Sequence, residues 1–231
     1  MDRYKSADEV REEHIQVLGP VLGIFYHALQ RDVTWIHAKW LEFRKLYARS
    51  EKRIDLLNEA AAFFFRVVQD VLWEDVLLHI ARLTDPPKSA GRPNLTINRL
   101  AELIPDPIVA EDVHNLVNTA IQKCSFAREW RNRHLAHRDL DLAMETRQAT
   151  ALPGVSRQSV IDALSAISAV LNRVESHYFD SEVAFGHFLV HDDADALVHH
   201  LVVAVRYGER KRERFRQGKP LPEDLEPEPE A

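Results

Sequence analysis

The sequence predicts an all-α protein, built as a bundle of long antiparallel helices with additional flanking helices. Apolar residues recur every three or four positions over long stretches, which is the period of a helix packed on one side. Only seven glycines and eleven prolines occur in 231 residues, too few for the many turns of a β-sandwich or barrel. With 45% apolar and 29% charged residues, the chain can fill a core and keep a solvated surface, so a wholly disordered chain is excluded.

The first two helices are marked by a capping signal and a break. Ser6 followed by Glu9 is the pattern of a capping box, and it predicts a helix that reaches about residue 30. Gly19-Pro20 should kink or interrupt this helix. A second helix is expected from about Asp32 to Ala48.

The third predicted helix is the longest. Ser50 should cap it, and Asp85-Pro86-Pro87 should end it. A straight helix to Thr84 would be about 50 Å long at 1.5 Å per residue. Its expected apolar stripe consists of Ile54, Leu57, Ala61, Phe64, Val68, Leu72 and Val76. The three consecutive aromatic residues Phe63, Phe64 and Phe65 are expected in the core.

Four further helices follow, separated by polar or proline-containing segments. A brief helix is expected near residues 97–104 and a long one over about 109–135. Residues 139–155 lack periodicity and are interpreted as a loop. Ser156 should cap a helix over about 158–179, and a last helix should cover about 193–216.

Charge is distributed unevenly along the chain. We expect one domain over residues 1–218 and a disordered acidic tail over 219–231, which carries five acidic residues and is rich in proline. Without those five charges the net charge changes from -6 to -1. Residues 121–140 hold five basic and two acidic residues, a local +3, so an anionic partner could bind there.

Several classes of protein are excluded. Cys124 is the only cysteine, which rules out an internal disulfide framework and a cysteine-based zinc cluster. The amino terminus is charged where a signal peptide would be apolar, and no apolar run approaches the ~18 residues of a membrane span. We therefore expect a cytoplasmic protein with no membrane partner.

The helix predicted over 109–135 has an apolar stripe with a polar end. Its apolar or small positions are Val113, Val117, Ala120, Cys124 and Ala127. The next two positions on the same line are Arg131 and His134. Burying an unpaired charge is costly, so these side chains need a partner, a cleft or a subunit interface. The alternative is a helix end that frays into solvent, where Arg and His favour the helix dipole.

Two segments resemble a known family. Arg131, Asn132 and His137 fit the motif of the HEPN superfamily, an arginine followed by a polar residue and, a few residues later, a histidine near a helix end. The fuller string RNRHLAHRD, residues 131–139, is similar to the abortive-infection AbiU-like branch. Upstream, LHIARLTD followed by proline, residues 78–86, resembles the end of a long helix in that branch. The resemblance covers roughly residues 50–140.

The resemblance implies a HEPN-like fold and a metal-independent endoribonuclease of phage defence or a toxin–antitoxin system, without a cofactor. Arg131 would steady the phosphate, His137 would transfer protons and Asn132 would align them. The expected partners are RNA, a second copy of the chain that completes a composite site, and a possible antitoxin protein. Further RNA-binding candidates are Lys123, Arg128, Arg133, His134 and Arg138.

Other interpretations remain open. A non-catalytic helical module that binds RNA, a nucleotide or a protein partner is the alternative function, since a fold does not carry its chemistry by itself. Arg133 lies four residues before His137 and could be the operative arginine. A metal site at His134 and His137 lacks a third ligand, and no metal is expected. The run of residues 191–195 is better explained as a helix cap than as a metal site.

Overall fold

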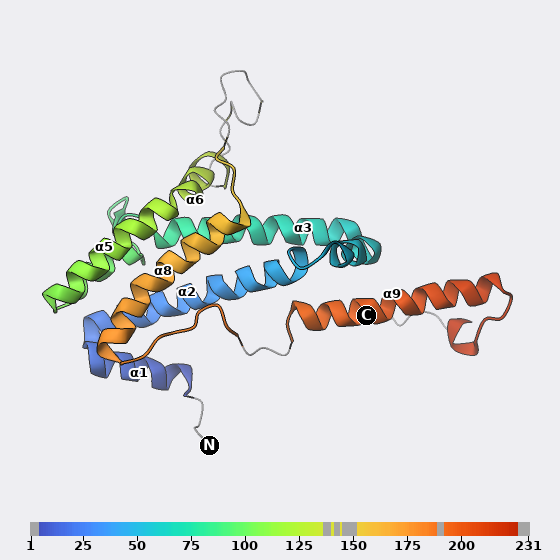
Figure 1. Cartoon of the computed structure of the whole chain (residues 1–231), viewed down its shortest axis with the longest axis horizontal. Helices are drawn as coiled ribbons and strands as arrows, with labels where there is room; N and C mark the ends of the chain where they lie inside the picture. The colour runs from blue at the N-terminus through green and yellow to red at the C-terminus, as the bar shows by residue number, and fades with distance from the viewer. Residues whose placement is uncertain (1–4, 136–139, 141–143, 145–151, 189–191, 226–231) are drawn as a thin grey trace. The chain divides into compact units, whose positions relative to one another are not determined.

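The computed structural model describes residues 5–135, 140, 144, 152–188 and 192–225. Within these residues the regular structure is helical, as predicted, apart from one two-stranded hairpin (Figure 1). The elements in order are α1 (Ala7–Leu18), α2 (Pro20–Tyr47), α3 (Glu51–Leu83), β1 (Lys88–Ser89), β2 (Arg92–Pro93), η1 (Ile97–Arg99), α4 (Leu100–Leu103), α5 (Pro107–Lys123), α6 (Ser125–Trp130), the π turn η2 (Arg131–Leu135), α8 (Arg157–Tyr178), α9 (Ala194–Arg216) and the 3-10 turn η3 (Pro222–Leu225).

The chain groups into two compact units. Unit 1 comprises Met1–Trp40 and Leu72–Phe188, and unit 2 comprises Leu41–Val71 and Leu189–Ala231. The long helices α2 and α3 each contribute residues to both units. The single domain expected over residues 1–218 stays a prediction. The segment expected to be a tail includes, in its described part, the turn η3.

The core of unit 1 is centred on α5 and α8, which pack along each other (Figure 1). The predicted stripe on α5 and α6 is confirmed, because all five of its apolar or small residues are buried. Helix α8 faces it with Val160, Leu164, Ile167, Leu171 and Val174. The buried Glu175 accepts a 2.6 Å hydrogen bond from the Tyr26 hydroxyl, so this carboxylate is not left unpaired in the core.

The break between the first two helices lies at Gly19 alone. Gly19 ends α1 at φ 81°, and Pro20 starts α2, where its missing N–H costs no hydrogen bond. Helix α2 then runs without interruption through Asp32, so the predicted helix start at that residue is wrong. At Gly23, a β-carbon would lie 2.4 Å from the carbonyl oxygen of His14, so only glycine allows α1 to pack this closely.

Helix α3 is not straight. Ala61 has φ -164° and ψ 71°, values outside the helical region, so the helix changes direction there. Of the three phenylalanines that follow, Phe65 is buried, whereas Phe63 and Phe64 are 84% and 59% exposed. The prediction of all three aromatic residues in the core is therefore wrong for two of them, because the non-helical residue rotates the following turn relative to a regular stripe.

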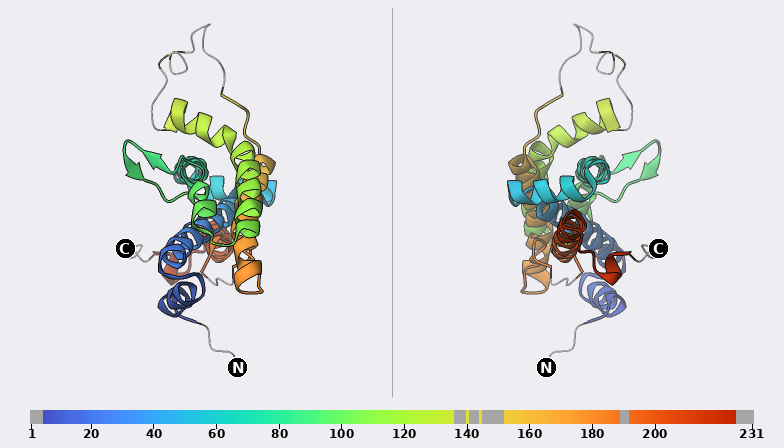
Figure 2. Two further views of the ribbon diagram at one scale, coloured as in Figure 1. Left: turned by 90° about the vertical axis from the view of Figure 1, so that its left-hand side faces the viewer. Right: turned by 90° about the vertical axis from the view of Figure 1, so that its right-hand side faces the viewer.

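The helix predicted over 109–135 consists of three consecutive pieces, α5, α6 and the π turn η2, with the first break at Cys124. The brief helix near 97–104 is confirmed as η1 and α4. The polar linker after α3 contains the antiparallel hairpin of β1 and β2, which the sequence did not indicate (Figure 2).

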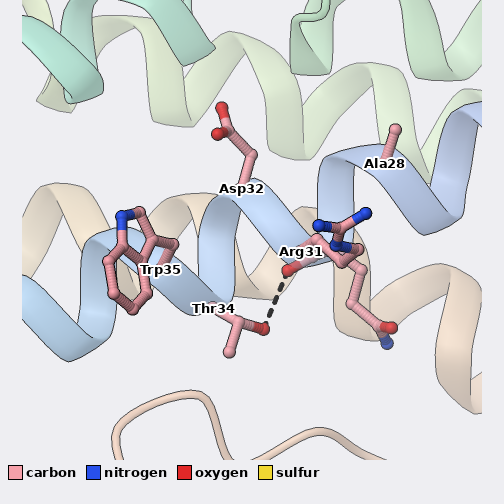
Figure 3. Close-up of a pocket in the computed structure, with 6 residues that line it drawn as sticks. Ala28, Arg31, Asp32, Thr34 and Trp35 are labelled. Atoms are coloured by element: carbon pink, nitrogen blue, oxygen red, sulfur yellow. Dashed lines mark hydrogen bonds between the residues drawn. The ribbon is translucent and has the colours of Figure 1, made fainter. Parts of the chain in front are cut away.

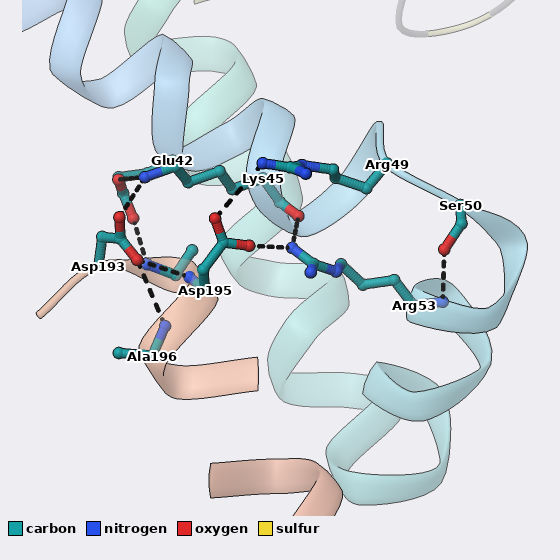
Figure 4. A network of polar contacts seen from close by, with 9 residues as sticks. Glu42, Lys45, Arg49, Ser50, Arg53, Asp193, Asp195 and Ala196 are labelled. Atoms are coloured by element: carbon teal, nitrogen blue, oxygen red, sulfur yellow. Dashed lines mark hydrogen bonds and ion pairs between the residues drawn. The ribbon is translucent and has the colours of Figure 1, made fainter. Parts of the chain in front are cut away.

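The last two long helices begin as predicted. Ser156 caps α8 by accepting a hydrogen bond from the Ser159 N–H. Asp193 caps α9 by accepting from Asp195 and Ala196, which confirms the capping interpretation. Figure 4 shows that Asp193 also pairs with Lys45, whose hydrogen bond is the main reason that the pKa of Asp193 lies below its ordinary value. Within the described residues, no helix is both long and apolar enough to cross a bilayer.

Candidate functional site

Arg131 is held by two acceptors at the end of α6. Its Nη1 forms an ion pair with Asp85, the second residue after α3, and its Nε donates a 3.1 Å hydrogen bond to Asn132 Oδ1. Both members of the ion pair are largely covered, with 22% of the Arg131 side chain and 16% of the Asp85 side chain exposed. Neither of these contacts uses its Nη2, which has no acceptor among the described residues.

The position of Asp85 is set by two side chains from the segment after the hairpin. The Thr96 hydroxyl lies within hydrogen-bond distance of the carbonyl oxygens of Leu83 and Asp85, at 2.9 and 2.7 Å. The Asn98 side-chain amide donates to the carbonyls of Thr84 and Asp85 at 3.1 and 2.8 Å. These contacts satisfy carbonyls that the end of α3 leaves without helical partners. The backbone that carries Asp85 is therefore firmly anchored.

The structure thus joins the two segments in which the sequence resembles the HEPN family. Asp85 ends the upstream segment and Arg131 begins the downstream one, and the two side chains pair directly. The expectation that a polar residue at the end of the apolar stripe needs a partner is confirmed for Arg131. Residues 131–135 form a π turn, a rare geometry that is frequent at functional sites, so spacing rules for a regular α-helix do not apply there.

His134 lies on the same turn, beside an aromatic ring. Its Nε2 is 4.0 Å from Glu74 Oε1, and its ring centroid is 5.5 Å from that of Trp130. The Trp130 indole N–H donates a 3.0 Å hydrogen bond to the carbonyl of Pro153, which fixes the ring. His134 therefore has defined neighbours in unit 1 and is about one-third exposed.

The remaining predicted site residues differ in their surroundings. Lys123 is exposed at the end of α5. Arg128 is half-buried and donates a 3.2 Å hydrogen bond to the carbonyl of Ile121. Its guanidinium therefore bonds a backbone carbonyl close to the helix break at Cys124. Arg133 is half-buried and has a partner of its own. His137 and Arg138 lie outside the described residues, so their predicted roles stay predictions.

Comparison with known proteins identifies the family. The family model of AbiU2, a HEPN family, matches residues 20–197. This chain belongs to the AbiU2 family of HEPN proteins. The match runs from the first residue of α2 into the first turn of α9 and includes Asp85 and the Arg131 turn. No curated protein and no solved structure matches the chain.

This AbiU2 protein has a second polar feature, on α2, that the sequence interpretation did not include. A cavity of about 580 Å³ opens on this helix (Figure 3). Within it, Trp35 is 61% exposed and the Lys39 ammonium lies 5.9 Å from its ring centroid. The cavity is lined by Ala28, Gln30, Arg31, Asp32, Thr34 and Trp35.

One lining residue is paired with a buried histidine. Asp32 Oδ2 lies 2.9 Å from Nε2 of His79, which is only 2% exposed. Burial works to raise the pKa of Asp32, but the contact with His79 and the charge of Arg82 outweigh it, so the pKa lies below its ordinary value. The pair escaped sequence analysis because Asp32 was interpreted as a helix start, and 47 residues of chain separate it from His79.

Metal ligands do not gather in the described part of this AbiU2 protein, where no three His, Cys, Asp or Glu side chains are placed to hold an ion. The single cysteine, Cys124, is buried in the stripe of α5 and α6, and burial raises the pKa of its thiol to about 12. A thiolate nucleophile is therefore not part of this site at neutral pH.

Proposed function

We propose that this AbiU2-family chain is a metal-independent endoribonuclease of the HEPN type that acts in phage defence or a toxin–antitoxin system. The single observation that carries the proposal is the Arg131 guanidinium, which Asp85 and Asn132 hold through Nη1 and Nε. Family membership over residues 20–197 supports the same reaction class.

The proposed chemistry needs a base and a fixed positive charge. His137 removes the proton from an RNA 2′-hydroxyl, and the oxygen attacks the adjacent phosphorus. Arg131 stabilises the negative charge that develops on the phosphate oxygens. The P–O5′ bond breaks, the protonated His137 gives its proton to the leaving 5′-oxygen, and the products are a 2′,3′-cyclic phosphate and a 5′-hydroxyl. Asn132 keeps Arg131 in orientation through the Nε hydrogen bond.

The proposal includes a homodimer with a composite site. Each chain supplies only one Arg131. A phosphate shielded from water is stabilised better when hydrogen-bond donors contact it from two sides, which a second chain would provide. A two-fold axis near the motif would place two Arg131–Asn132 pairs and two copies of His137 around one RNA phosphate.

A non-catalytic module that binds RNA or a protein is the second candidate, and one contact favours it. The ion pair with Asp85 neutralises the charge of Arg131. In this interpretation the pair has a structural role and links the end of α3 to the end of α6. The two candidates differ in what the Asp85 carboxylate does. In the enzyme it positions a charge that acts on phosphate, whereas in the module it satisfies a structural one.

The deciding experiment measures cleavage of single-stranded RNA by the wild type and by variants, with and without EDTA. We expect cleavage that survives EDTA and leaves cyclic phosphate ends. Arg131→Ala should lower the rate about 100- to 1,000-fold, because one preorganised donor is lost. His137→Ala should cost about 100- to 10,000-fold, and Asp85→Asn roughly 10- to 100-fold through misplacement of Arg131.

Asp75, on α3 and ten residues before Asp85, provides a matched control. Asp75→Asn breaks the 2.6 Å ion pair with Lys39 but touches neither Arg131 nor Asn132, so it should leave the rate unchanged. Circular dichroism must show each variant folded. Full activity of Arg131→Ala contradicts the proposed mechanism. Loss of activity in EDTA with rescue by zinc, and an equal loss in His134→Ala, would indicate a metal enzyme instead.

A further inference from the structure

The second half of α9 carries a basic stripe, exposed at Arg206, Tyr207 and Arg210 and half-buried at Lys211 and Arg214, that the proposed active site does not use. Residues 206–219 contain seven basic and two acidic residues, a net charge of +5. Ala194 and Val198 are buried near the start of the helix. At 100° per residue the opposite side, an arc of about 140°, carries the stripe. We define the α9 stripe as Arg206, Tyr207, Arg210, Lys211 and Arg214.

Most cations of the α9 stripe are available to a ligand. Arg206, Arg210 and Lys211 have no ion-pair partner within the described residues, although other arginines of this helix do. Tyr207 is 46% exposed, and the neighbouring Phe215 is 47% exposed. Aromatic faces interleaved with basic residues are the arrangement that proteins use for single-stranded nucleic acid, because bases stack while cations contact phosphates.

One end of the α9 stripe already binds an anion, and this anion belongs to the chain itself. The turn η3 follows α9 and returns the chain toward this helix (Figure 1). Its Asp224 carboxylate contacts two residues of the α9 stripe. Arg214 donates two hydrogen bonds to this carboxylate, from Nε to Oδ2 at 2.7 Å and from Nη2 to Oδ1 at 2.5 Å. The Tyr207 hydroxyl donates to Oδ1 at 3.3 Å, and the Leu221 N–H donates to Oδ2 at 2.9 Å.

This donor set matches what a phosphodiester requires. A two-pronged guanidinium, a hydroxyl and a backbone N–H recognise carboxylate and phosphate oxygens alike. The Asp224 side chain is fully covered although it lies in a short acidic segment at the end of the described chain. Hydrogen bonds from Arg214 hold the pKa of Asp224 far below its ordinary value, so the carboxylate stays ionised.

We propose that the α9 stripe binds single-stranded RNA, and that Asp224 competes with an RNA phosphate for Arg214 and Tyr207. The inference rests on the proposed RNA substrate but assigns it a binding surface in unit 2, separate from the Arg131 motif of unit 1. Exposed rings favour a single strand over a duplex, whose bases are already stacked and paired. The acidic C-terminal segment thereby limits how tightly free protein holds RNA.

The test is fluorescence anisotropy with a short, labelled 2′-O-methyl RNA, which lacks the 2′-hydroxyl and so cannot be cleaved by the proposed reaction. Arg210→Glu/Lys211→Glu should raise Kd about tenfold or more and lower the salt slope by roughly 1 to 1.5. Arg44→Glu/Lys52→Glu is the matched control, with the same charge change at exposed positions of α2 and α3 in the same unit. It should bind like the wild type.

Asp224→Asn should have the opposite effect and lower Kd roughly three- to tenfold, because Arg214 and Tyr207 are released. Its control is Glu223→Gln, which removes an exposed neighbouring charge that forms no hydrogen bond or ion pair with Arg214 within the described residues. A chain ending at Gly218 removes Asp224 by another route and should also bind more tightly. Circular dichroism checks the fold of each variant.

The proposal is overturned if the wild type does not bind, or if both double variants lose the same affinity. It is also overturned if Asp224→Asn and Glu223→Gln have equal effects, or if an acidic peptide or an RNA duplex binds more tightly than the single-stranded oligonucleotide. An inactive protein that still binds through the α9 stripe would contradict the proposed cleavage and leave this inference standing.

Discussion

Three histidines of unit 1, the buried His14 and His27 and the half-buried His37, have pKa values below the ordinary value. The His37 ring stacks on Phe185 at 5.7 Å, and its Nε2 lies 2.9 Å from the Ser168 hydroxyl. Burial lowers the pKa of His37 to about 4. His14 and His27, with ring centroids 5.4 Å apart, also have lowered pKa values because burial penalises their charged forms. Protonation of these rings is therefore coupled to unfolding.

The first residue-scale prediction is acid sensitivity below pH 6.5. A histidine whose pKa is depressed in the folded state binds its proton more readily when unfolded, so stability is present above about pH 6.5 and is lost as the pH falls toward 4. For His37 this loss amounts to roughly 1–2 kcal/mol between pH 7.5 and pH 5. Urea unfolding at the two pH values should show it, and His37→Gln should reduce the difference. An unchanged difference in this variant would assign the effect to His14 and His27.

At the scale of elements, the change of direction at Ala61 decides which aromatic side chains α3 buries. In unit 2, Phe65 is 5% exposed, and its carbonyl accepts a 2.9 Å hydrogen bond from the Tyr47 hydroxyl. Phe63 lies two residues earlier and points its ring into solvent. Two chemically identical side chains on one helix therefore contribute very differently to stability.

This contrast gives a matched pair of substitutions. Phe65→Ala should lower the free energy of unfolding by about 3–5 kcal/mol, because it leaves a cavity in the core of unit 2. Phe63→Ala should change it by no more than about 0.5 kcal/mol, as at other exposed positions. Urea denaturation followed by circular dichroism measures both. Equal losses would mean that Phe63 is covered in solution, for example by a second copy of the chain.

At the scale of the whole molecule, the AbiU2 match covers residues 20–197 and so includes residues of both units. The site described on one chain has one Arg131 and one Asn132, and the proposed chemistry uses two copies. Assembly is therefore the property on which the composite site depends.

We predict a homodimer in solution with both motifs near its two-fold axis. Sedimentation equilibrium at tens of micromolar should give twice the monomer mass. A spin label on Glu129→Cys, an exposed position next to the motif, should give one short inter-subunit distance. The native Cys124 is fully buried and should not be labelled. A monomer, or labels on opposite faces of a dimer, would remove the composite site.

Much of the fold follows from local patterns that a single sequence displays. The all-α class, the Ser6, Ser156 and Asp193 caps and the buried stripe of α5 and α6 are all set by side chains within a few residues of one another. Helix capping and amphipathic periodicity are short-range effects, so they can be recognised without knowing what packs against the helix. The HEPN resemblance of residues 131–139 is likewise a local string.

Tertiary structure decided the features that depend on distant partners. The sequence around Arg131 does not indicate that its partner is Asp85, 46 residues away. It also does not indicate that Thr96 and Asn98 anchor Asp85. The bend at Ala61 determines that Phe65 is buried while Phe63 and Phe64 are exposed, which a regular helical stripe would not predict. Asp224 was counted with a solvated acidic tail, yet it is buried against Arg214, because a charge can be buried wherever packing supplies donors for it. Periodicity reports which face of a helix is apolar, whereas pairing across the fold depends on how helices are brought together.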